Sequence, residues 1–298
     1  MSAVGVNKEK IREAVVNMFK VNMGVKPGEK ILVITDFPDQ KHWLEWDAEK
    51  LSDVVKRSIL CRTVYEIAKE TFKDNTVEFV VYPCTGRHGV EPPDYVAEKM
   101  KQAQVIVAIT SFSLTHTNAR AEANKAGARV ASMPMFLAEM FEPGGPMAAD
   151  YRYIDESSKK LAEALEGKKT IRIVTESGTD ITMSVEGRKW GLDTGILTEP
   201  GTFGNLPAGE VYIAPLEGTA NGKFVVEKGW YPGLEENMIF YVENGLVVKI
   251  EGGGKVGDYY RELLGLEPKK EGPEYEARRN IAELGIGSNP NAKRPDNI

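Results

Sequence analysis

The sequence predicts an α/β amino-terminal domain with a parallel sheet and flanking helices, followed by an α+β domain that is mainly antiparallel. In the first half, short apolar runs alternate with stretches of helical periodicity, which is typical of a doubly wound sheet with right-handed crossovers. After Gly167, strand-like runs of period two are joined by hairpin turns. A chain of 298 residues is long enough for two ordinary domains. We place the boundary near Glu166, giving domains of residues 1–166 and 167–298.

The elements of the first domain follow from apolar spacing and cap residues. Asn7 can cap a first helix that runs to about Met23. Runs of the buried-strand type are expected at 30–35, 77–82, 105–110 and 128–132. Helices are expected at about 44–72, 93–100, 118–126 and 151–165.

The carboxyl ends of parallel strands are where such a sheet holds its ligands. The side chains expected at this edge are Asp36, Asp39, Arg87, His88, Ser111 and His116. The first turn has no glycine, so a dinucleotide fingerprint is missing. For His116 a hydrogen-bonded histidine near a helix start is the plainer interpretation, and a substrate contact is the alternative.

The second domain begins with a hairpin of strands at 171–175 and 180–185, with Ser177 and Gly178 in the turn. Further strands are expected from Glu210 and at 223–226. The pair at 239–242 and 246–250 flanks Asn244-Gly245, a strong hairpin signal. Helices are expected at 256–264 and about 273–284, whereas 288–295 has no apolar anchor and should be loosely held.

Composition and charge exclude several classes of protein. The net charge of −6 argues against nucleic acid as the main partner. The two cysteines, Cys61 and Cys84, are too few for a disulfide scaffold and fit a reducing cytosol. No apolar run is long enough to span a bilayer, and the amino terminus lacks the apolar core of a signal peptide. We therefore expect a cytoplasmic protein without a membrane partner.

Three glutamates draw attention in the second domain. Glu210 and Glu217 lie where a short strand meets loops rich in glycine and proline, a setting that suits Zn²⁺, Mn²⁺ or Co²⁺. The alternative is that both are solvated residues at strand ends. Glu283 would lie in the last turn of a helix, where an acid is disfavoured by about 0.3–1 kcal/mol. A bound metal would remove that penalty, and so would a neighbouring Arg279 or Lys293.

Four segments resemble the metallo-aminopeptidases of the aminopeptidase T and aminopeptidase S type, which include thermophilic leucyl aminopeptidases. They are NLPAGEVYIAP at 205–215 with EGTA at 217–220, HTNAR at 116–120, ANKAGAR at 123–129, and ELGIGSNP at 283–290. The resemblance implies a homodimeric hydrolase that uses two divalent ions (Zn, Co or Mn) to activate a water against peptide substrates. It places metal ligands on Glu210 and Glu283.

The remaining ligands of that family, two histidines and an aspartate, come later in the chain, and this sequence has no histidine after His116. We therefore expect a chain ending at Ile298 to lack part of the site, to bind no metal pair firmly and to be inactive as a peptidase. The resemblance identifies neither the general base nor the preferred N-terminal residue.

Two alternatives to the aminopeptidase remain. An iron-dependent ring-cleaving dioxygenase of the dihydroxypyridine type resembles the same family and binds a single iron through histidines and an acid. The pair of Glu210 and Glu283 favours the peptidase, because one iron does not need both. The other alternative is a non-catalytic binding protein on the same fold.

Overall fold

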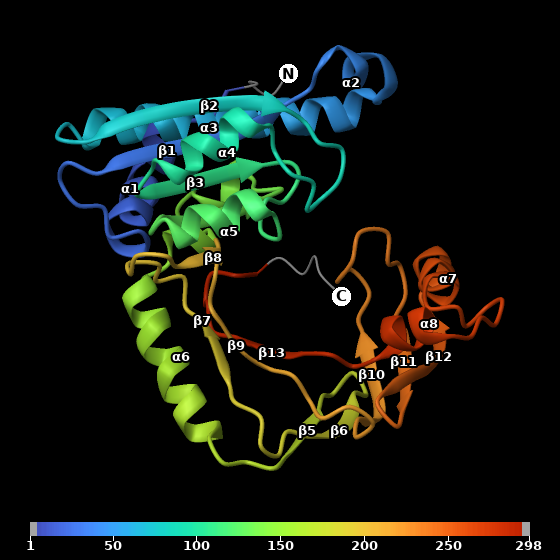
Figure 1. The fold of residues 1–298 in the computed structure, drawn as a ribbon. Coiled ribbons are helices and arrows are strands. Elements are labelled where there is room, and N and C mark those ends of the chain that lie inside the picture. The colour runs from blue at the N-terminus through green and yellow to red at the C-terminus, as the bar shows by residue number, and fades with distance from the viewer. Residues whose placement is uncertain (1–4, 294–298) are drawn as a thin grey trace. The chain divides into compact units, whose positions relative to one another are not determined.

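The computed structural model describes residues 5–293, which form two compact units (Figure 1). Within that range, the first unit comprises residues 5–157, 193–209 and 289–292, and the second comprises 158–192, 210–288 and 293. These units differ from the single boundary that we expected near Glu166, because the chain enters each unit more than once.

The first unit is built on a five-stranded sheet in which every pairing is parallel. The strands are β1 (Lys30–Phe37), β2 (Thr76–Pro83), β3 (Val105–Thr110), β4 (Arg129–Pro134) and β8 (Phe203–Asn205), in the order β2-β1-β3-β4-β8. The predicted α/β class is confirmed. Strand β8 was not expected, and it extends the sheet by pairing with β4.

Helices cover both faces of this sheet. They are α1 (Lys8–Asn17), which continues as the π-helix η1 (Met18–Asn22), α3 (Ala48–Thr71), α4 (Asp94–Lys101) and α5 (Asn118–Lys125). The short helix α2 (Gln40–Glu45) precedes α3 and has no buried residue. In β1, Ile31 and Val33 pack in one apolar cluster with residues of α1 and α3, and Leu32 and Ile34 pack in another with residues of α4 and α5. Burial on both faces explains why β1 is a continuous apolar run rather than an alternating one.

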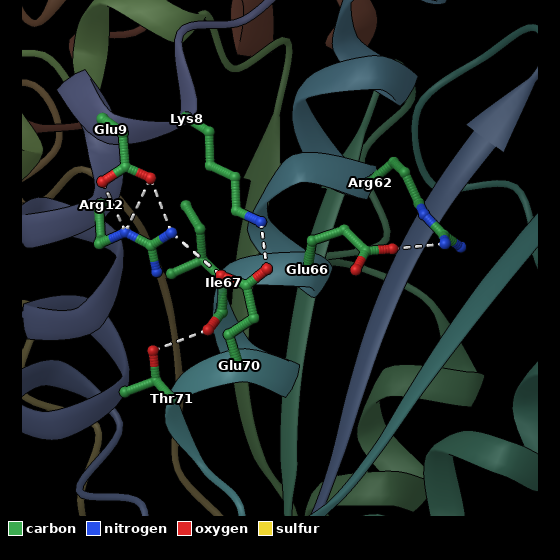
Figure 2. A network of polar contacts seen from close by, with 8 residues as sticks. All are labelled: Lys8, Glu9, Arg12, Arg62, Glu66, Ile67, Glu70 and Thr71. Atoms are coloured by element: carbon green, nitrogen blue, oxygen red, sulfur yellow. Dashed lines mark hydrogen bonds and ion pairs between the residues drawn. The ribbon is translucent and has the colours of Figure 1, made fainter.

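Salt bridges join α1 to α3 at the surface (Figure 2). Arg12 lies 2.8 Å from Glu9 in its own helix and 3.0 Å from Glu70 of α3, and Lys8 also pairs with Glu70. Because Glu70 accepts from both cations, its pKa is lowered. These exposed pairs align two helices whose buried faces supply most of the stability.

The long helix expected over about 44–72 is present as α3, but it begins only at Ala48. Helix α2 ends at Glu45, and Trp46 has extended backbone angles. Asp47 then caps α3, its carboxylate accepting a hydrogen bond from the Lys50 backbone at 2.8 Å. An aspartate that satisfies a free N–H starts a new helix at this point.

The chain then passes through the short 3₁₀ helices η2 (Ala138–Met140) and η3 (Pro146–Ala148) to α6 (Tyr151–Leu165), as expected for the last helix of this half. In the part of the chain that the structure describes, none of the helices combines the length and apolar character needed to cross a bilayer.

The second unit contains an antiparallel sheet in the order β12-β11-β10-β6-β5. Its strands are β5 (Thr170–Val174), β6 (Asp180–Ser184), β10 (Asn221–Val226), β11 (Met238–Glu243) and β12 (Leu246–Gly252). Both predicted hairpins are present. Asn244 and Gly245 have φ of 48° and 79°, the left-handed angles that their turn requires.

Helices α7 (Gly254–Leu263) and α8 (Pro273–Arg279) follow this sheet. The prediction of a helix through Leu284 is wrong, because α8 ends at Arg279 and the chain becomes strand β13 (Leu284–Gly287). β13 pairs with β9 (Glu210–Ile213) in a small sheet of order β13-β9-β7, with β7 at Gly191–Asp193. The backbone hydrogen bonds that this segment makes with β9 outweigh the sequence pattern that predicted a helix.

The segment after β13 is held more firmly than its sequence suggests. Asn289 is buried, and its side-chain amide donates to the carbonyls of Ala208 at 2.9 Å and Pro146 at 3.1 Å. Asn291 donates to the carbonyl of Gly145 at 3.1 Å. Hydrogen bonds from the two amide side chains hold the segment in place of apolar contacts. The expectation of a loosely held segment is therefore wrong for residues 288–293. Residues 294 and 295 lie outside the described range.

We expect Asn289→Ala to lower the free energy of unfolding by about 1–3 kcal/mol, because it leaves two carbonyls of the first unit without their donor. Urea unfolding followed by fluorescence measures this. Pro290→Ala is the control, since Pro290 is exposed. Equal stability of the Asn289→Ala variant and the parent would show that these bonds do not anchor the segment.

Candidate functional site

Glu210 is the first residue of β9, and its side chain lies along the neighbouring strand. The register places Glu210 opposite Gly287, at one end of the ladder between β9 and β13. The half-buried carboxylate reaches Gly285, where an added Cβ would overlap Glu210 Oε1. Gly285 therefore makes room for the Glu210 carboxylate, a requirement that no spacing in the sequence reveals.

Glu283 lies just before β13 and is exposed. It is not in the last turn of a helix, so the helix-dipole argument that drew attention to it is wrong. Arg279, the neighbour considered as its partner, donates instead to the carbonyls of Leu264 and Gly265. Residues two apart in a strand point to the same face of the sheet. If the extended backbone continued from Gly285 back to Glu283, Glu283 would lie on the face that carries Glu210.

A complete metal site is not found among these groups. Across residues 5–293, no three His, Cys, Asp or Glu side chains converge so as to hold an ion. Catalytic zinc ions usually have three protein ligands, and Glu210 and Glu283 supply two carboxylates at most. Further ligands would have to join Glu210 and Glu283 to hold an ion, and the assignment of these glutamates as ligands stays a prediction.

Asp36 is the central polar group at the carboxyl edge of the parallel sheet. Its carboxylate accepts hydrogen bonds from the backbone N–H groups of Ser111 at 2.7 Å and Phe112 at 3.2 Å. Burial raises the pKa of Asp36, against the opposing effect of these bonds and of the Arg57 charge. The carboxylate thereby holds the end of β1 to the loop after β3.

The other residues predicted at this edge have separate roles. Asp39 caps α2, and His88 accepts a hydrogen bond from the Ser113 backbone at 3.0 Å. His116 is exposed, and it is Thr117 that caps α5. The structure thus brings Asp36 and Ser111 together but gives no shared site for Asp39 and His116.

The pH dependence of stability tests the environment of Asp36. The pKa of Asp36 is higher in the folded protein than in the unfolded chain. Its contribution to the stability of the folded protein is therefore present at low pH and is lost as the pH rises through the folded-state pKa. We expect Asp36→Asn to gain stability relative to the parent as the pH rises above 3.8, the ordinary value for this group. Melting temperatures across a pH series measure this difference, and a relative loss by the variant over the same range would contradict it.

Fold and site together define a two-unit α/β protein with a carboxylate held against a glycine on a short sheet. Two solved structures share this fold. A 2,5-dihydroxypyridine dioxygenase from Pseudomonas putida KT2440 is similar with a TM-score of 0.67 and 15% identity, over 97% of this chain and 79% of that one. Wild-type AmpT from Thermus thermophilus is similar with a TM-score of 0.52 and 14% identity, over 94% of this chain and 78% of that one.

The sequence model of the 2,5-dihydroxypyridine 5,6-dioxygenase (NicX) family matches residues 10–295, so the chain belongs to that family. No curated protein sequence matches the chain. The family match supports the alternative that we ranked below the aminopeptidase. The aminopeptidase resemblance is supported only in part, by the likeness of fold to AmpT.

Proposed function

We propose that the protein is a metal-dependent ring-cleaving dioxygenase that acts on a dihydroxypyridine or a closely related dihydroxylated ring. The observation that carries this proposal is the family match over residues 10–295, nearly the whole chain. The fold shared with a dihydroxypyridine dioxygenase is consistent with it. Iron is the metal that we propose, since it is the ion that the resemblance to this type of dioxygenase implies.

Glu210 is the residue to which we assign the most direct role. A half-buried carboxylate can accept the proton of a ring hydroxyl or supply an anionic ligand, and Gly285 leaves it room to do so. Glu283 is exposed and immediately precedes β13, and it is the second acid that we assign to this site. A homodimer, implied by the aminopeptidase resemblance, is a further part of the proposal that light scattering can test.

Oxygen uptake tests the proposal. The protein expressed from its full coding sequence, stripped of metal and supplied with Fe²⁺, should consume O₂ when 2,5-dihydroxypyridine is added. The parallel assay measures chromophore release from an amino-acid anilide with Co²⁺, Zn²⁺ or Mn²⁺, before and after a chelator. Metal-dependent anilide hydrolysis without oxygen uptake would overturn the dioxygenase in favour of the aminopeptidase. Neither activity, with small ligands still bound in a thermal-shift screen, would favour a binding protein.

A further inference from the structure

A cavity of about 350 Å³ lies at the carboxyl edge of the parallel sheet. The sheet order β2-β1-β3-β4 means that the connections leaving β1 and β3 run in opposite directions. Open α/β sheets bind their ligands at such a switch point. The cavity is lined there by the loop after β3, the end of β4 and one face of α3.

The face of α3 that lines the cavity carries Lys50, Val54 and Arg57 at helical spacing, so the three side chains lie on one side of the helix. Lys50 is at the rim, with its ammonium 4.0 Å from the centre of the Trp46 ring. Arg57 is buried, with 7% of its surface exposed. Two cations from one helix face therefore point toward the same space.

Arg57 is a buried cation whose hydrogen-bond partners are neutral. Its Nη1 donates to Ser111 Oγ at 2.7 Å, and its Nε donates to the carbonyl of Phe136 at 3.3 Å. Burial lowers the pKa of Arg57, although the charges of Asp36 and Asp53 act in the opposite direction. The oxygens of Asp36 accept hydrogen bonds from the N–H groups of Ser111 and Phe112. A buried guanidinium with five N–H donors is incompletely neutralised by such partners.

The walls beside this cation are apolar. The Phe112 ring lies near two other rings, with its centre 6.0 Å from that of Trp46 and 5.8 Å from that of His88. Met135 also lines the cavity and is 59% exposed, and its φ of 56° is unusual for a residue other than glycine. An apolar body could thus lie on Phe112 and Met135 while a charged end reaches Arg57.

Acidic residues also line the cavity, but they lie nearer to solvent. Asp47 is occupied as the cap of α3, Glu49 is exposed, and the Asp53 side chain is 57% exposed and lies 3.9 Å from Lys56. Water and salt screen such charges, whereas the field of a buried guanidinium is screened much less. The floor of the cavity therefore favours an anion.

We propose that this cavity binds a small organic carboxylate with an apolar body, the carboxylate contacting Arg57 and Ser111 and the body packing on Phe112 and Met135. The Ser111 hydroxyl, which accepts from Arg57, keeps its own proton to donate to such a ligand. Every residue that forms this site belongs to the first unit, whereas Glu210 and Glu283 belong to the second.

Benzoate and its uncharged analogue benzamide are the probes. The protein is labelled with [¹³C-methyl]methionine, and the Met135 signal is assigned with Met135→Leu. Benzoate should shift the Met135 signal saturably. The affinity for benzamide should be lower by about tenfold or more, because benzamide lacks the charge. Inorganic phosphate should bind more weakly than benzoate, since it has no apolar body. An unshifted Met135 signal, or equal binding of all three probes, would overturn the proposal.

Arg57→Met tests the role of the guanidinium, with Arg62→Met as the matched control on the same helix outside the cavity. Calorimetry should show benzoate affinity reduced about tenfold or more by Arg57→Met and unchanged by Arg62→Met. If Arg57→Met does not fold, Lys50→Ala at the rim and Ser111→Ala provide the test, and both should weaken benzoate more than benzamide. Unchanged benzoate affinity in these variants would contradict the assignment.

Discussion

Glu210→Ala should reduce turnover by about a hundredfold or more, because the substitution removes the half-buried carboxylate that we place at the reaction site. The loss should appear in the oxygen-uptake assay, since Glu210 is assigned as a ligand or base of the ring cleavage. Steady-state kinetics at several metal concentrations measure it, and circular dichroism checks that the fold is intact. If added metal restores turnover, Glu210 acts as a ligand; if it does not, the carboxylate has another role.

Glu217→Ala is the matched control for this experiment. Glu217 belongs to the same segment, but its side chain is 71% exposed and pairs with Arg188 at 2.7 Å. Its removal should leave turnover near that of the parent, whereas Glu283→Ala should cause a loss like that of Glu210→Ala. Near-normal turnover of Glu210→Ala at low metal would show that the residue is not a ligand, and the same result for Glu283→Ala would remove that residue from the site.

Gly285→Ala should reduce turnover by about 10- to 100-fold while leaving the fold intact, because the added methyl group occupies the space of the Glu210 carboxylate. Gly285 does not have a left-handed φ, so alanine fits its backbone. The flexible end of Glu210 must move instead. The comparison of kinetics with melting temperature separates this displacement from general destabilisation.

Gly287→Ala is the control for that change. It lies in the same strand, and no heavy atom is within 4 Å of the position its Cβ would take. We expect turnover close to that of the parent. In a Glu210→Ala background, Gly285→Ala should cause no further loss, because the group that it displaces is already absent. Additive losses would mean that Gly285 acts through something other than Glu210.

The regular elements were predictable where the local pattern agrees with the final packing. Strand β1 reads as a buried run because both of its faces are covered, and Asn244-Gly245 specifies its own turn. Strands β8 and β13 were missed because they span three and four residues and include glycines. Their pairing partners lie far away in the chain, so their structure depends on tertiary contacts rather than on local propensity.

The candidate site was predictable only in part, for the same reason. The turn-rich flanks of β9 point to Glu210 from the sequence alone. The role of Gly285 depends on the register between two strands that are about seventy residues apart, which single-sequence patterns do not contain. Arg57 was overlooked because an arginine in a long helix usually faces solvent. Its position on the apolar face with Val54 and Cys61 is the signal that could have identified it.

The mass of the product formed under ¹⁸O₂ tests the central claim most directly. The iron-loaded protein from the full coding sequence is incubated with 2,5-dihydroxypyridine, and the product is analysed by mass spectrometry. A ring-cleaving dioxygenase should place both atoms of one O₂ molecule in a ring-opened product, and Glu210→Ala should form little of it. Unchanged dihydroxypyridine and no label, together with metal-dependent release of an amino acid from an anilide, would contradict the dioxygenase assignment.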